Sequence, residues 1–160
     1  MVDELLLSES VSFNHRKTRL PLVHCPAASC QRRSGRWLAN IRIDVQELYG
    51  PLIIWAIQNW QNPGHSLHLA LNTTMLWNRF CVVVVSVMAH GRAIPLHWQT
   101  LEHPSASVTA AVSIALLEKA DQLLSGFTAI RILADRAFSC DELTAWFNGR
   151  YRWMCDAVEW

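Results

Sequence analysis

Two polar residues, Asn72 and Asp135, each follow a short run whose apolar residues are spaced as in a β-strand. In open α/β sheets, ligands collect outside the carboxyl ends of the strands. A carboxylate pair at such ends would bind Mg²⁺ through hard oxygen ligands, and two ions could hold the attacking and leaving oxygens of a phosphoryl transfer. Here one member of the pair is an amide. Spacing alone favours a simpler interpretation, in which Asp135 pairs with Arg136 or caps the next turn and Asn72 is a turn residue.

Other signatures of a site are weak or missing. His24, Cys25 and Cys30 have the residue types of a zinc site, but no second ligand pair accompanies them. The chain contains no Gly-x-Ser-x-Gly, P-loop or Gly-x-Gly-x-x-Gly sequence, which excludes the commonest hydrolase and nucleotide-binding motifs. The dispersed histidines are expected to be polar core or rim residues.

Charge is distributed unevenly along the chain, although the net charge is only +1. Seven of the 14 Lys and Arg residues lie between Ser10 and Ile43, a segment without Asp or Glu, whereas residues 44–160 have a net charge of −3. A basic arm before a nearly neutral body is typical of a polyanion-binding tail. The alternative is a solvated, disordered leader, which the lack of a helical or aromatic pattern favours.

Composition restricts the class of protein. With 160 residues, 51% hydrophobic and 17% charged, the chain is expected to form one domain with a buried core and not to be intrinsically disordered. No apolar run approaches the ~20 residues of a membrane span, and the N-terminus lacks the pattern of a secretory signal. We therefore expect a cytoplasmic protein with no membrane partner and with reduced cysteines.

The first helix is expected over residues 44–60. Asp44 and Glu47 have the spacing of a capping box, and Gly50-Pro51 should break or kink the helix. Residues 1 to about 35 contain turn formers and no sustained period, so they are expected to be mostly loop. The helix should present one apolar face, consisting of Val45, Leu48, Tyr49, Leu52, Ala56, Ile57 and Trp60.

The rest of the chain predicts helices packed on a mixed sheet. The first three strands should be antiparallel, the second buried on both faces, and the third at an edge or bulged because Pro95 cannot donate a hydrogen bond. The expected elements are strand 67–71 with a turn at 72–74, strand 79–88, strand 92–101, a helix capped by Ser105 or Ser107 and ended by Gly126, strand 129–134, a helix opened by a capping box at 139–142, and a weak last strand within 151–160.

Five short segments then occur in a fixed order: RWLAN (36–40), LALNTTMLWN (69–78), HGRAIPL (90–96), LEHPS (101–105) and LADRAF (133–138). Together they resemble the DDE transposases of bacterial insertion sequences, particularly those of the fourth insertion-sequence family. The resemblance covers about Arg36 to Trp153. It implies an α/β, ribonuclease-H-like (retroviral-integrase-like) mixed sheet with flanking helices, incomplete at the C-terminus and preceded by a short helical region.

The resemblance also implies a division of the chain and a set of site residues. The parts would be a basic, largely irregular leader (1–35), a helical region (36–64) and a truncated catalytic core (65–160). In such enzymes two Asp and one Glu bind Mg²⁺. Asp135 aligns with the second acid, the first aligns with Asn72, and the third has no counterpart before Trp160. Outside the resemblance, the positive charge of the basic segment leads us to expect that Arg32 and Arg33 contact DNA; within the matched segments, Arg36 and Arg136 are expected to do so.

The function implied is DNA binding with Mg²⁺-dependent cleavage and strand transfer at transposon ends, carried out by a homo-oligomer or together with a full-length transposase. Because an amide at position 72 removes a negative charge from the metal site, we expect this copy to be inactive. The alternatives are a non-catalytic, DNA-binding or regulatory fragment, and a pseudogene product without function that exposes apolar surface and aggregates.

Overall fold

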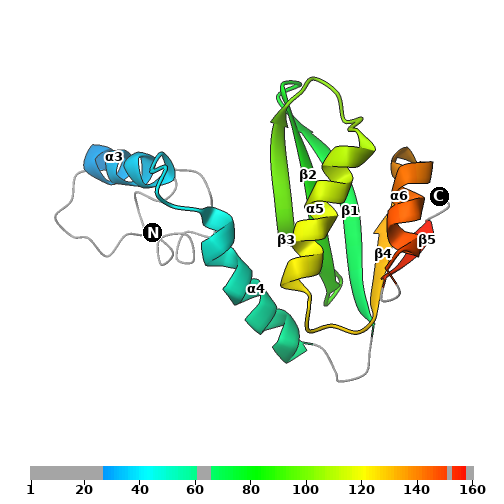
Figure 1. Cartoon of the computed structure of the whole chain (residues 1–160). Helices are drawn as coiled ribbons and strands as arrows, with labels where there is room; N and C mark the ends of the chain where they lie inside the picture. The colour runs from blue at the N-terminus through cyan, green and yellow to red at the C-terminus, as the bar shows by residue number, and fades with distance from the viewer. Residues whose placement is uncertain (1–26, 61–65, 151–152, 158–160) are drawn as a thin grey trace. The chain divides into compact units, whose positions relative to one another are not determined.

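The computed structural model describes residues 27–60, 66–150 and 153–157. Two compact units are present: residues 1–44 contain α3, and residues 45–160 contain every other element (Figure 1). The elements in chain order are α3 (Ala27–Leu38), α4 (Val45–Trp60), β1 (Leu67–Leu76), β2 (Phe80–Ala89), β3 (Arg92–Glu102), α5 (Ala110–Leu123), β4 (Ile130–Ala134), the 3₁₀ turn η1 (Arg136–Phe138), α6 (Asp141–Asn148) and β5 (Trp153–Ala157).

The five strands form one mixed sheet in the order β3-β2-β1-β4-β5. β1, β2 and β3 are antiparallel neighbours, whereas β4 is parallel to β1, and β5 is parallel to β4. In Figure 1, α5 and α6 lie on the same side of this sheet. The predictions of three antiparallel strands in succession and of helices on a mixed sheet are therefore confirmed. Among the described residues, no helix is both long and apolar enough to cross a bilayer.

β3 is the edge strand that Pro95 predicts. Pro95 pairs with Ser86, and the register with β2 shifts between Val85 and Ser86. A proline cannot donate to a ladder, so it is tolerated at an outer strand and beside a bulge.

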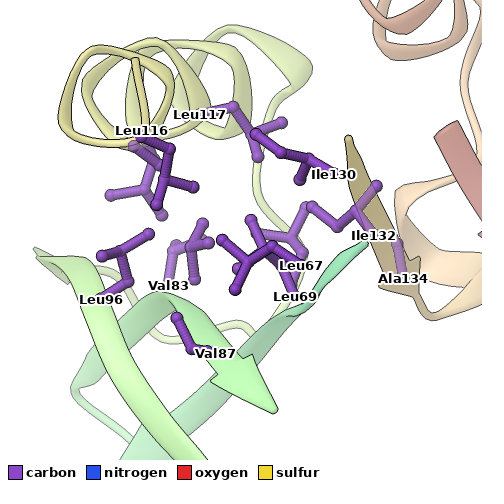
Figure 2. Close-up of a cluster of buried hydrophobic side chains, with 14 of the residues drawn as sticks. Leu67, Leu69, Val83, Val87, Leu96, Leu116, Leu117, Ile130, Ile132 and Ala134 are labelled. Atoms are coloured by element: carbon purple, nitrogen blue, oxygen red, sulfur yellow. The ribbon is translucent and has the colours of Figure 1, made fainter. Parts of the chain in front are cut away.

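The core lies between the sheet and α5, because one face of each strand is apolar. On β1 and β4 the buried residues alternate with exposed or half-buried ones, as in Leu67 and Leu69 or Ile130 and Ile132. Figure 2 shows these side chains beneath Leu116 and Leu117 of α5. On β2 the second face is only half-buried, so the prediction of complete burial on both faces is wrong.

β1 is longer than its sequence suggests. A turn was expected at residues 72–74, but β1 continues to Leu76 because Asn72, Thr73 and Thr74 all pair with the valines of β2. Thr is β-branched and fits a pleated surface, which outweighs the turn preference of Asn. The hairpin turns instead at Trp77 and Asn78, which have φ values of +53° and +51°.

α4 is continuous through Pro51, contrary to the expected break. Its two halves are attached to the same surface: Tyr49 Oη donates to the Pro95 carbonyl at 2.7 Å, and Ile57 is fully buried. A Cβ on Gly50 would lie 3.3 Å from Leu123 Cδ2, so the missing side chain allows α4 to approach α5 closely.

The expected apolar face of α4 is correct only in part. Its members Tyr49 and Ile57 lie on the core side together with Ile53, whereas Val45, Leu48 and Leu52 are exposed. A helix with large apolar residues on more than one side has no single periodicity that selects its buried face.

The starts of the other helices differ from the expected ones. α3 begins at Ala27, within the segment expected to be loop, because its Ala, Gln and Arg residues are good helix formers. α5 begins after Thr109 and not at Ser105 or Ser107. The Ser107 amide instead donates to Ser105 Oγ at 3.1 Å, a local bond that competes with helix formation.

α6 has no capping box. Its N-cap residue is Cys140, which makes no side-chain capping bond, so the interpretation of residues 139–142 is wrong. The helix is positioned by burial of Leu143, Trp146 and Phe147.

Candidate functional site

Asn72 and Asp135 lie side by side in register on β1 and at the end of β4. These strands are parallel neighbours, and the last pair of their register is Leu71 with Ala134. Asn72 and Asp135 are the next residue on each side. The expectation that the two strands would be neighbours is confirmed, but Asn72 lies inside β1 and not at its end.

The pair lies on the sheet face opposite to the helices. Leu71 and Ala134 point to the buried side, and side chains alternate along a strand, so the two following residues belong to the other face. Both Asn72 and Asp135 are exposed. Burial of the residues before them therefore fixes the backbone of the pair while its polar side chains face solvent.

Local hydrogen bonds define the surroundings of the pair. Asn72 Oδ1 accepts a bond from the Thr73 amide at 2.8 Å. The Asp135 carbonyl accepts one from the Phe138 amide at 2.9 Å and so starts the turn η1. The Arg136 side chain, expected either to contact DNA or to pair with Asp135, lies outside the described residues.

The pair does not fit a magnesium site as it stands. Mg²⁺ requires several hard oxygen ligands, usually including carboxylates, whereas one carboxylate and one amide oxygen that already accepts a bond are present here. Within the described ranges, no three His, Cys, Asp or Glu residues form a group that could hold a metal ion.

The structure does not test the candidate zinc site. His24 and Cys25 lie outside the described residues, and so does the side chain of Cys30.

The three candidate DNA-binding arginines of the N-terminal part share one helix. Arg32, Arg33 and Arg36 are exposed on α3, and Nε of Arg32 and of Arg36 each donates to a carbonyl one turn earlier. α3 contains no acidic residue. It can offer positive charge to a polyanion, but it belongs to a different compact unit from Asn72 and Asp135.

A second candidate surface, on α4, was not predicted from the sequence. The outer side of α4 exposes four apolar side chains, which we call the α4 outer stripe: Val45, Leu48, Leu52 and Trp55. The signal that could have revealed it is their spacing of three, four and three residues in a helix that also carries a second apolar face.

No protein-family model matches the chain, and no curated protein is significantly similar to it in sequence.

Proposed function

We propose that this chain is a member of the DDE transposase family whose catalytic site has lost activity. The observation that carries the proposal is the adjacency of Asn72 and Asp135 on one exposed face of two parallel strands. This is where the resemblance requires the first two acidic residues of the catalytic triad to meet. The mixed sheet with flanking helices is compatible with a ribonuclease-H-like core.

The chemistry of the pair supports loss of activity. Phosphodiester cleavage by such a site depends on two divalent ions held by carboxylates. An amide at position 72 leaves one carboxylate between the two strands, so metal affinity should be low. Incubated with supercoiled plasmid and Mg²⁺, the chain should produce no nicking above background. Nicking that disappears in Asp135→Ala would contradict this.

The family assignment is tested by restoring the missing charge. Asn72→Asp would place a second carboxylate beside Asp135, so it should create a Mn²⁺ site measurable by titration calorimetry or electron paramagnetic resonance. Thr74→Asp is the matched control, because residue 74 lies on the same face of β1, two residues farther from Asp135. Asn72→Asp should bind Mn²⁺ at least about tenfold more tightly than this control.

The titration gives a clear outcome either way. Adding Asp135→Asn to Asn72→Asp should abolish the gain in affinity. If Asn72→Asp binds Mn²⁺ no better than Thr74→Asp, the two positions do not form a latent metal site, and the transposase assignment loses its main support.

A second candidate function, a non-catalytic DNA-binding or regulatory protein, is favoured by α3. Its three exposed arginines carry positive charge that no acidic residue of the helix offsets. Replacing Arg32, Arg33 and Arg36 by Ala should weaken binding to a DNA duplex and reduce the slope of log K against log salt by up to about 2.7, or ~0.9 per lost phosphate contact.

The control for DNA binding uses exposed arginines from the other unit. Replacing Arg79 and Arg92 with Ala should leave the salt dependence unchanged, because neither belongs to α3. If the wild-type chain does not bind DNA, this function is excluded. If, in addition, Asn72→Asp binds Mn²⁺ no better than Thr74→Asp, both proposed functions lose their support, and the third alternative, a product without function, is favoured.

A further inference from the structure

The β1–β2 turn holds an exposed tryptophan in a backbone conformation that tryptophan rarely adopts. Trp77 has a φ of +53°, and Asn78 follows at +51°. Turns with two residues of positive φ are dominated by Asn, Asp and Gly, and positive φ is an outlier for a bulky side chain. Strain of this kind costs free energy and is concentrated at functional sites, so it points to a use of the Trp77 side chain other than folding.

The Trp77 ring is open to a ligand. The residue is 86% exposed, although large apolar side chains contribute most to stability when they are buried. Its ring meets the Phe80 ring at an interplanar angle of 76°, with centroids 6.4 Å apart. An edge-to-face contact at this distance covers little of the indole, so its flat surface remains free for stacking.

The residues beside Trp77 are held in place. Arg79 Cζ lies 5.1 Å from the centroid of the Phe80 ring, and Arg79 Nε and Nη2 donate to Glu102 Oε1 at 2.9 and 2.8 Å. Phe80 and Glu102 are also partners in the ladder between β2 and β3. An exposed ion pair adds little stability by itself, but this one orders the base of the turn. Trp77 therefore projects from a fixed support, which lowers the entropy lost on binding.

Trp77 follows directly on the strand that carries Asn72. The ladder between β1 and β4 ends at the pair Leu71 and Ala134, so the β1–β2 hairpin extends past the end of β4 (Figure 1). Five residues separate positions 72 and 77, which is about 17 Å in an extended strand. A stacked DNA strand with one nucleotide every ~3.4 Å covers this length in on the order of five nucleotides. One strand can therefore reach both Trp77 and the Asn72–Asp135 pair.

We propose that Trp77 stacks against an unpaired base of a DNA strand that passes the Asn72–Asp135 pair. This inference rests on the proposed function, which makes DNA the ligand of that pair. An indole stacks on the flat face of any base, so the contact requires no particular DNA sequence. Because the indole is uncharged, stacking adds affinity without changing the number of phosphate contacts, and the salt dependence of binding stays the same.

The test measures binding of the full chain to a labelled DNA single strand of about ten nucleotides by fluorescence anisotropy. Trp77→Asn, which suits the positive φ and so keeps the turn, should raise the dissociation constant about tenfold and leave the slope of log K against log salt unchanged. Trp77→Phe retains an aromatic ring and should recover part of the loss. Trp55→Asn is the matched control, because Trp55 is 68% exposed but lies on α4, and it should bind like the wild type. Thermal melts check that all three variants are folded.

A strand with the same backbone but no bases separates stacking from charge. The wild type and Trp77→Asn should bind this abasic strand equally, and both about as weakly as Trp77→Asn binds the normal strand. A wild type that does not bind the normal strand, or that binds it no better than Trp77→Asn, would overturn the proposal. A difference between the two proteins that persists with the abasic strand would also overturn it. The Mn²⁺ titration of Asn72→Asp does not involve Trp77, so a failure of the proposed function is detected separately.

Discussion

At the scale of single residues, Tyr49 connects α4 to the edge of the sheet. Its hydroxyl donates to the Pro95 carbonyl at 2.7 Å, and its ring meets Trp98 edge to face with centroids 5.6 Å apart. Burial raises the pKa of Tyr49 above its usual value of 10.0. The folded state therefore retains this proton to a higher pH than the unfolded state does.

The first prediction concerns the alkaline limit of stability. The contribution of the Tyr49 proton is complete below pH 10 and is lost as pH rises through the raised pKa, because the unfolded phenol ionises first. Tyr49→Phe should cost about 0.5–1.5 kcal/mol near pH 8 through the lost hydrogen bond, and should reduce the decline in stability above pH 10. Urea denaturation at several pH values measures both effects.

The pH experiment must compare the free energy of unfolding of the wild type with that of Tyr49→Phe at each pH. Burial also raises the pKa of the Cys81 thiol above 9.0, so the wild type should begin to lose stability before Tyr49 ionises. Cys81 is the same in both proteins, so its effect cancels in the difference. Parallel curves for the wild type and Tyr49→Phe would contradict the assigned role of the hydroxyl.

At the scale of elements, the second prediction tests which face of α4 belongs to the core. Ile57→Ala removes a fully buried side chain and should cost about 2–5 kcal/mol in the free energy of unfolding. Leu52→Ala is the matched control on the exposed face and should change stability by no more than about 0.5 kcal/mol. Denaturant titrations at concentrations where the chain is monomeric compare the two, and equal costs would mean that the faces are assigned wrongly.

The third prediction concerns the β1–β2 turn. Trp77 and Asn78 both have positive φ, which suits Asn but strains a bulky aromatic residue. The Trp77 ring also lies edge to face with the Phe80 ring, with centroids 6.4 Å apart, but Trp77 is 86% exposed, so this interaction stabilises the turn little. Trp77→Asn should therefore stabilise the chain by about 0.5 kcal/mol, whereas Asn78→Ala should destabilise it by a similar amount. Thermal melts of both variants test this prediction. If Trp77→Asn lowers the melting temperature as Asn78→Ala does, Trp77 is not strained in the turn.

The same elements show what could be predicted from the sequence. Strands β2 and β4 were predicted nearly to the residue, because alternation and valine runs are local signals. The end of β1 was not predicted correctly, because Thr73 and Thr74 join the strand only through pairing with residues of β2. The buried face of α4 was predicted only in part, because a helix with apolar residues on two sides is oriented by contacts such as those of Gly50 and Tyr49 with distant elements. For the candidate site, the positions of Asn72 and Asp135 after two predicted strands were enough to predict that they lie close together. That both lie on the same face of the sheet could be inferred only from the pairing register of β1 and β4.

At the scale of the whole molecule, the described hydrophobic core lies entirely within the second compact unit. Its buried residues run from Ile53 to Phe147. None comes from α3, whose described side chains are mostly exposed. Folding of the sheet and its helices should therefore depend mainly on residues 45–160.

The fourth prediction follows from that distribution. A chain of residues 45–160 should unfold in a single cooperative transition with a melting temperature within a few degrees of the full chain, because deletion of 1–44 removes none of the described core. The control is a chain of residues 66–160, which also lacks Ile53 and Ile57 and should lose at least about 4 kcal/mol at ~2 kcal/mol or more for each. Calorimetry and circular dichroism measure both. A broad transition or aggregation of the 45–160 chain would show that residues 1–44 stabilise the sheet, and the division into two units would not describe its folding.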